Sequence, residues 1–203
     1  TVNTIGDMAF ASSSVYEVEF DNNSRLLKIG KGVFENCNTL YKVVFTGSSI
    51  LTSIGKRAFY GCKSLRVFSN ASASITTLED YAFYGCTSLT EMDVNENKFI
   101  SIGVGAVEGL GYLAAKANSV KMFGNILISY NGLDKIVIIP EETTVIYDEA
   151  FMNNVAIRTV RFAGASKLVK INDRAFYGCV NLSDITFPAS VKEVGYQVMD
   201  GTV

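Results

Sequence analysis

One nine-residue phrase recurs along this chain, and its recurrence constrains the fold more than any other feature of the sequence. Ile-Gly-x-x-Ala-Phe-x-Gly-Cys occupies residues 54–62, and close copies occupy 78–86 and 171–179. Looser copies begin at Ile5, Ile29, Ile102, Ile146 and Val194. Successive copies start 23 to 25 residues apart, except for one interval of 44 residues. The sequence therefore predicts a tandem array of units of about 24 residues, with one expanded unit at 102–145.

Each unit carries a second apolar signature downstream of its Phe. After Phe176, for example, Leu182, Ile185 and Phe187 lie at offsets of six, nine and eleven residues. Residues two apart share one face of a strand, so offsets nine and eleven point inward and offsets eight, ten and twelve point outward. A further apolar pair, such as Leu168 and Ile171, precedes the next unit and predicts a short turn or brief strand.

A stacked solenoid satisfies this pattern. One unit has too few apolar side chains to form its own core, whereas stacked units bury a continuous column. Equivalent strands then form a parallel sheet with neighbours about 4.8 Å apart. The recurring phenylalanines should form the main buried column: Phe34, Phe59, Phe83, Phe151 and Phe176.

The full pattern, Leu-x-x-Ile-Gly-x-x-Ala-Phe-x-Gly-Cys-x-x-Leu-x-x-Val-x-Phe, resembles the BspA-like (Treponema-type) leucine-rich repeat over nearly the whole chain. The resemblance implies an α/β repeat: a right-handed solenoid with a concave parallel β-sheet and short convex turns or strands. Members of that family are typically secreted or cell-surface proteins, often implicated in adhesion.

The expanded unit departs from the repeat. Ile126–Tyr130 and Ile136–Pro140 are β-rich runs on either side of Asn131-Gly132, a dipeptide that favours a tight hairpin turn. The sequence therefore predicts a β-hairpin insertion around 123–140, its first arm antiparallel to the repeat strand. We expect one solenoid over 1–203. Neither end has a polar capping unit, so we expect a fragment of a longer protein.

Composition removes several classes of function. The chain has no His, which excludes serine–histidine and cysteine–histidine catalysis. Eighteen Lys and Arg against 20 Asp and Glu leave a net charge of −2, so nothing favours nucleic acid as a partner. No apolar run reaches the roughly 18 residues of a membrane span, so membrane insertion is not expected.

Other motifs carry no chemistry. Cys37, Cys62, Cys86 and Cys179 occupy the same place in their units, which predicts a column of free, buried thiols rather than a zinc site. The nucleotide-loop and calcium-loop fragments near Gly103 and Asp93 lack required residues. We therefore predict no enzyme, no cofactor and no metal.

What remains is an outward face. The acidic residues on it could attract a basic partner or hold a divalent cation weakly, and the alternative is a solvated strand face. The predicted binding surface consists of Glu17, Glu19, Asp21, Lys42, Val44, Val67, Ser69, Glu91, Asp93, Asn95, Tyr130, Ile136, Ile138, Thr159, Arg161, Asp184 and Thr186.

These features together predict a non-enzymatic protein- or glycan-binding module of an extracellular or cell-surface protein. The resemblance implies adhesion to host extracellular macromolecules through the concave sheet. Two alternatives stay open: a structural spacer between other domains of the parent chain, and an accessory domain beside a catalytic one.

Overall fold

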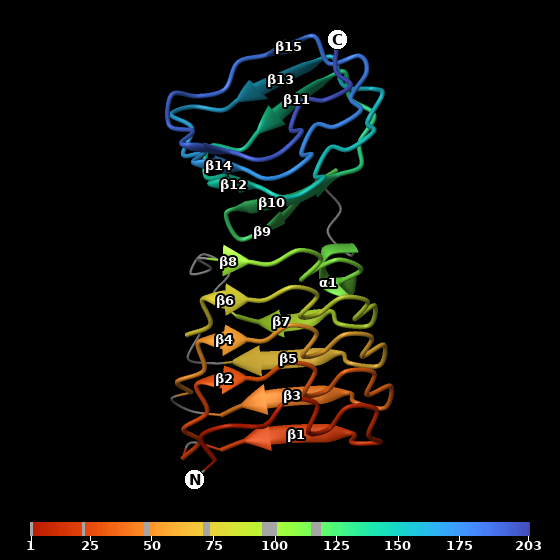
Figure 1. Cartoon of the computed structure of the whole chain (residues 1–203), viewed down its shortest axis with the longest axis vertical. Helices are drawn as coiled ribbons and strands as arrows, with labels where there is room; N and C mark the ends of the chain where they lie inside the picture. Colours follow the sequence, from red (N-terminus) through yellow and green to blue (C-terminus); the bar gives the residue numbers. More distant parts are fainter. Residues whose placement is uncertain (1, 22, 47–48, 71–73, 95–100, 115–118) are drawn as a thin grey trace. The chain divides into compact units, whose positions relative to one another are not determined.

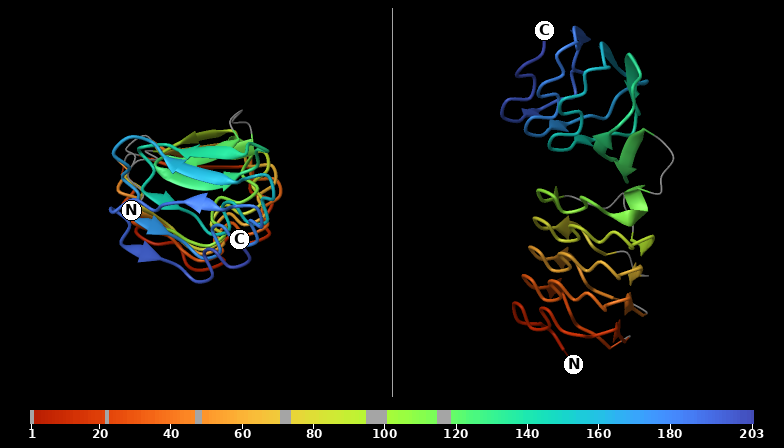
Figure 2. Two further views of the ribbon diagram at one scale, coloured as in Figure 1. Left: turned by 90° about the horizontal axis from the view of Figure 1, so that it is seen from above. Right: turned by 90° about the vertical axis from the view of Figure 1, so that its right-hand side faces the viewer.

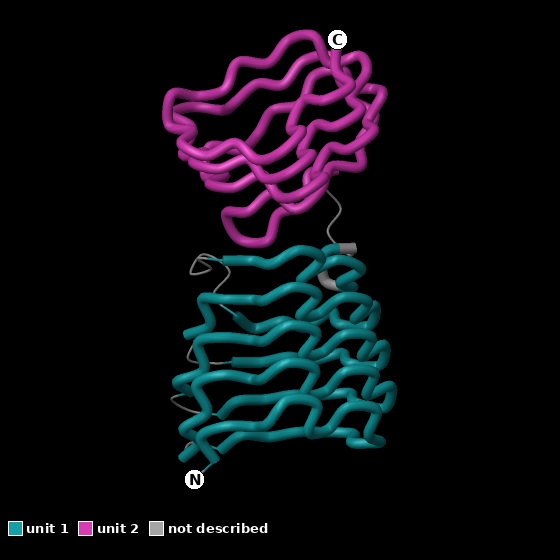
Figure 3. The backbone as a smooth tube through the Cα atoms, in the orientation of Figure 1, with its two compact units in different colours: residues 1–116 teal, residues 117–203 magenta. Residues whose placement is uncertain are grey.

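The chain forms two compact units, residues 1–116 and 117–203, shown in separate colours in Figure 3. The computed structural model describes residues 2–21, 23–46, 49–70, 74–94, 101–114 and 119–203. The prediction of one continuous solenoid over 1–203 is not decided by this division and stays a prediction.

Unit 1 is a stack of similar coils, each with a longer strand on one side and a two-residue strand on another (Figures 1 and 2). The longer strands form a parallel sheet in the order β1 (Glu17–Phe20), β3 (Lys42–Phe45), β5 (Val67–Asn70) and β7 (Glu91–Asp93). The short strands form a second parallel sheet of β2 (Lys28–Ile29), β4 (Ser53–Ile54), β6 (Thr77–Leu78) and β8 (Ser101–Ile102). Equivalent residues pair in register, because each coil repeats the last.

The turn between the short and the long strand continues the ladder by backbone means. Arg57, Phe59 and Gly61 each donate their N–H to a carbonyl of the next coil, at 2.8 to 2.9 Å. Arg57 and Gly61 have positive φ, and the same pair of left-handed residues, four apart, recurs in the other coils. Glycine adopts this conformation without steric cost, which explains the Gly of the Phe-x-Gly-Cys phrase.

The predicted aromatic column is present in each unit. In unit 1 the rings of Phe34, Phe59 and Phe83 are fully buried and stack at 5.3 and 5.0 Å between centroids. In unit 2 the rings of Tyr130, Phe151 and Phe176 stack at 5.4 and 4.7 Å. Tyr130 thus takes a phenylalanine's place in the column and is only 7% exposed.

Unit 2 has two sheets. The longer repeat strands form the parallel order β11 (Ile136–Ile139), β13 (Thr159–Phe162) and β15 (Asp184–Ile185). The other sheet contains β16 (Glu193–Val194), β14 (Lys170–Ile171), β12 (Val145–Ile146), β10 (Ile126–Tyr130) and β9 (Val120–Phe123). Their inward residues share one buried cluster that includes Leu127, Val137 and Phe176.

The hairpin exists, but its predicted pairing is wrong. β10 pairs antiparallel with β9, and the turn falls at Gly124-Asn125 rather than at Asn131-Gly132. β10 also pairs in parallel with β12, through Ile126 with Val145, and so belongs to the short-strand sheet. β11 joins the other sheet, beside β13. Burial of Leu127 and Tyr130 fixes this arrangement, which outweighs the local turn preference of Asn-Gly.

The α/β description is not confirmed. Among the described residues the only α-helix is the four-residue α1 (Gly111–Ala114), so each unit is a parallel β-solenoid with turns in place of helices. The handedness of the solenoid stays a prediction.

Candidate binding surface

The outward face of the unit 1 sheet is built by strict alternation. Inward residues such as Val43 and Phe45 are buried, and the residues between them point outward. The parallel register places the outward side chains in two rows across the sheet. The first row is Glu17, Lys42, Val67 and Glu91, and the second is Glu19, Val44, Ser69 and Asp93.

This register separates the acidic residues into two groups. Glu17 and Glu19 lie on β1, whereas Glu91 and Asp93 lie on β7, with β3 and β5 between them. Three strand spacings amount to about 14 Å, too far for one cation to bridge. Within the described part of the chain, no three His, Cys, Asp or Glu side chains converge as metal ligands would.

The two acidic groups also differ in their partners. On β7, Glu91 lies 3.6 Å from the Nε of Arg66, and Asp93 accepts a hydrogen bond from the Ser69 hydroxyl at 3.1 Å. On β1, no described residue forms a hydrogen bond or ion pair with the carboxylates of Glu17 and Glu19, and both side chains are exposed. Asp21 follows them, also exposed, and accepts from the Asn23 N–H. β1 therefore presents uncompensated negative charge.

The outward face of unit 2 is more apolar. Ile136 and Ile138 of β11 are each 61% exposed, and they lie in register with Thr159 and Arg161 of β13. Arg161 donates two hydrogen bonds to Asp184, at 2.9 and 2.5 Å. This contact lowers the pKa of the Asp184 carboxyl, so the pair stays ionised and is neutral overall.

Two of the predicted surface residues do not belong with the rest. Tyr130 is wrongly placed, because its ring is buried in the aromatic column and its hydroxyl donates to Asp134 at 2.8 Å. Asn95 lies outside the described residues. Thr186 is exposed but lies just beyond the end of β15.

Each unit has a surface depression at the end of its longer strands. In unit 1 a depression of about 390 Å³ lies beside Glu19, Phe20 and Asp21. In unit 2 a depression of about 470 Å³ lies between the ends of β13 and β15. Sequence reasoning missed the residues beyond the strands in the second one, Gly164, Ser166, Phe187 and Pro188. A signal was available in Pro188, which has no N–H to continue a ladder.

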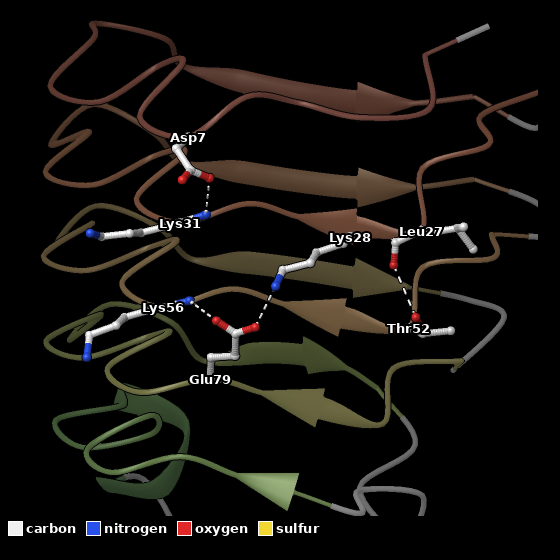
Figure 4. A network of polar contacts seen from close by, with 7 residues as sticks. All are labelled: Asp7, Leu27, Lys28, Lys31, Thr52, Lys56 and Glu79. Atoms are coloured by element: carbon white, nitrogen blue, oxygen red, sulfur yellow. Dashed lines mark hydrogen bonds and ion pairs between the residues drawn. The ribbon is translucent and has the colours of Figure 1, made fainter.

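The short-strand side of unit 1 carries a structural network rather than a site (Figure 4). Glu79 accepts hydrogen bonds from the side chain of Lys28 at 2.6 Å and from the backbone N–H of Lys56 at 2.9 Å, so one carboxylate links three coils. Asp7 binds the N–H of Lys31 in the same manner. The pKa of Glu79 is lowered, chiefly by the hydrogen bond from Lys28.

The four cysteines are free and buried, as predicted. Each thiol donates to the carbonyl of the aromatic residue one coil earlier: Cys62 to Phe34 at 2.9 Å and Cys86 to Phe59 at 3.1 Å, for example. Burial raises the pKa of Cys62 to about 12. These thiols are therefore parts of the core and not nucleophiles.

The geometry defines a repeat protein whose regular coils present flat strand faces, an architecture typically used as a binding scaffold. The chain belongs to the BspA-type leucine-rich repeat family: the family model matches in six copies, over residues 3–131 and 121–200. No relative was found among curated protein sequences. None of the described helices is long and apolar enough to cross a membrane.

Solved structures share the fold. A leucine-rich repeat protein of Treponema pallidum is 21% identical, with a TM-score of 0.51 over 92% of this chain and 76% of that one. A Bacteroides ovatus leucine-rich repeat protein is 21% identical (TM-score 0.47; 98% and 68% covered). The pneumococcal vaccine antigen PcpA is 23% identical (TM-score 0.46), and this chain spans about half of its length, 99% against 52%.

Proposed function

We propose that this chain is a non-enzymatic binding module that recognises a basic protein surface through the outward face of its longer strands. The uncompensated carboxylates of Glu17 and Glu19 carry the proposal, because the other strand-borne acids of the face already have partners. Charge presented on a regular β-surface attracts a cationic partner and speeds its association.

The setting of this activity follows from the family. We propose that the parent protein is secreted or held at the cell surface and that the partner is a host extracellular macromolecule. The other uses left open by the sequence, a spacer or an accessory domain, would leave the outward face without a ligand.

The proposal is tested by binding the intact chain to a panel of immobilised extracellular proteins of acidic and basic isoelectric point. At least one basic protein should bind, and its association rate should fall severalfold between about 50 and 300 mM salt, because screening weakens attraction between exposed charges. Glu17→Gln and Glu19→Gln should each reduce that rate.

Glu108→Gln is the matched control, since Glu108 is exposed and lies on a turn outside the sheet face. It removes the same charge and should leave binding unchanged. Equal effects of all three variants would mean that overall charge, and not the strand face, governs association. If no panel protein binds, the proposal is lost.

A further inference from the structure

The depression of unit 2 exists because one ladder stops early. β11 pairs with β13 over four residues, from Ile136–Thr159 to Ile139–Phe162. β15 pairs with β13 over only two, and the register ends at Val160–Ile185. Beyond this point Thr186, Phe187 and Pro188 run beside Arg161 and Phe162 without strand pairing, and the depression of about 470 Å³ opens between them.

The equivalent place in unit 1 is closed. There β1 and β3 pair through Phe20 and Phe45, whose rings stack at 4.4 Å and 8°. Phe45 is 1% exposed, whereas Phe162 and Phe187 are only partly buried and meet edge to face at 6.4 Å. The unit 2 depression is therefore a departure from the repeat and not a feature of every coil.

Its lining combines two chemistries. The rings of Phe162 and Phe187, with Pro188, supply apolar surface, while the Arg161–Asp184 pair and the hydroxyls of Ser166 and Thr186 supply polar groups. The volume lies in the range of small-molecule sites, which pair apolar surface with a few fixed polar groups. Because the ion pair is neutral and already closed, a charged ligand gains little from Arg161 and is repelled or left unpaired by Asp184.

We propose that this depression is a subsite for a neutral saccharide residue, with the apolar face of the sugar ring against Phe162 and Phe187 and its hydroxyl groups bonded by Arg161, Asp184 and Thr186. Sugar hydroxyls donate and accept at once, as a paired guanidinium and carboxylate require. The inference rests on the proposal that the outward faces bind ligands, and it adds the chemical class that unit 2 takes.

The test is an NMR titration of the intact chain with four probes: the methyl glycosides of glucose, galactose, mannose and N-acetylglucosamine. At least one should cause saturable shifts of the backbone amides of Gly164, Thr186 and Phe187, with a dissociation constant on the order of 1 mM, as befits an open site. Glucuronate and a blocked neutral tripeptide should cause none there.

Asp184→Asn keeps the side-chain shape and should weaken the glycoside at least tenfold. Glu91→Gln is its matched control, because Glu91 holds the same repeat position in unit 1 and also faces an arginine, Arg66. It should bind like the natural chain. An unchanged amide spectrum away from the substitution confirms that either variant is folded.

Three results overturn the subsite: no glycoside shifting these amides, equal affinities for Asp184→Asn and Glu91→Gln, or a response only to glucuronate or the peptide. The two proposals fail separately. Loss of glycoside binding with retained Glu17-dependent protein capture removes only the subsite, and the reverse result removes only the protein-binding face.

Discussion

The side-chain amide of Asn154 donates a hydrogen bond to the carbonyl oxygen of Gly132 at 3.0 Å, crossing from one coil to the next. In the following coil Cys179 makes the corresponding contact with the carbonyl of Phe151 at 3.0 Å. Asn154 does more than a thiol can, since its Oδ1 also accepts from the N–H groups of Ala156 and Ile157.

Asn154→Ala should therefore destabilise the protein by about 2 kcal/mol, because it removes three hydrogen bonds at a half-buried position. Asn154→Cys should recover part of this loss by restoring the inter-coil bond alone. Urea unfolding of the three proteins measures the order. Val155→Ala, at a 60% exposed neighbour, is the control and should change little. A cysteine variant no better than alanine would contradict the equivalence.

Phe83→Ala should cost about 3–5 kcal/mol, because it opens a cavity in the aromatic column. The ring is fully buried, stacks on Phe59 at 5.0 Å and meets the edge of Phe68 at 5.2 Å. Its neighbour Tyr84 is only partly buried and stacks on Tyr60 at the surface, so Tyr84→Ala should cost about 1 kcal/mol. Thermal unfolding compares the two, and equal losses would refute the inward register of Phe83.

The pair of Lys28 and Glu79 should give a small, pH-dependent stabilisation. The folded-state pKa of Glu79 is lowered, so the stabilisation is present above the unfolded pKa of about 4.3 and is lost as pH falls through the folded value. Because Glu79 is 38% exposed, we expect only about 0.5 kcal/mol near pH 7.

Glu79→Gln is the variant that tests this, since glutamine can still accept from the Lys56 N–H. The difference from the natural chain, followed by urea unfolding from pH 7 to pH 3, should shrink to zero below about pH 4. A difference that stays constant across this range would show that the carboxylate's charge contributes nothing.

The cysteine column should be chemically silent in the folded protein. Burial raises the pKa values of Cys62, Cys86 and Cys179, so little thiolate forms at pH 8. Ellman's reagent should titrate none of the four thiols in native buffer and all four in denaturant. Fewer than four under denaturant would mean that a disulfide forms. Stability should also decline above about pH 8.5, where unfolded thiols ionise and buried ones do not.

The sequence by itself determined the repeat length, the inward register and the chemistry of the columns. These features follow from periodicity: a side chain that recurs every two dozen residues at one offset meets its own copies in a stacked array, so Phe59 and Phe83 must stack and Cys62 must lie beside Cys86. Asn154 could be read in the same way, as a polar substitute able to reach the neighbouring turn.

Only the tertiary structure decided how the expanded unit is paired and which outward residues meet. Asn131-Gly132 has the local preference of a hairpin turn, yet the column of Phe151 and Phe176 takes up Tyr130 and places β10 beside β12. The pairing of Arg161 with Asp184, and the early end of the ladder next to it, likewise depend on two coils that are distant in sequence. Local propensity is worth little against burial of a large ring, and side chains about 23 residues apart become partners only once stacking has fixed the register.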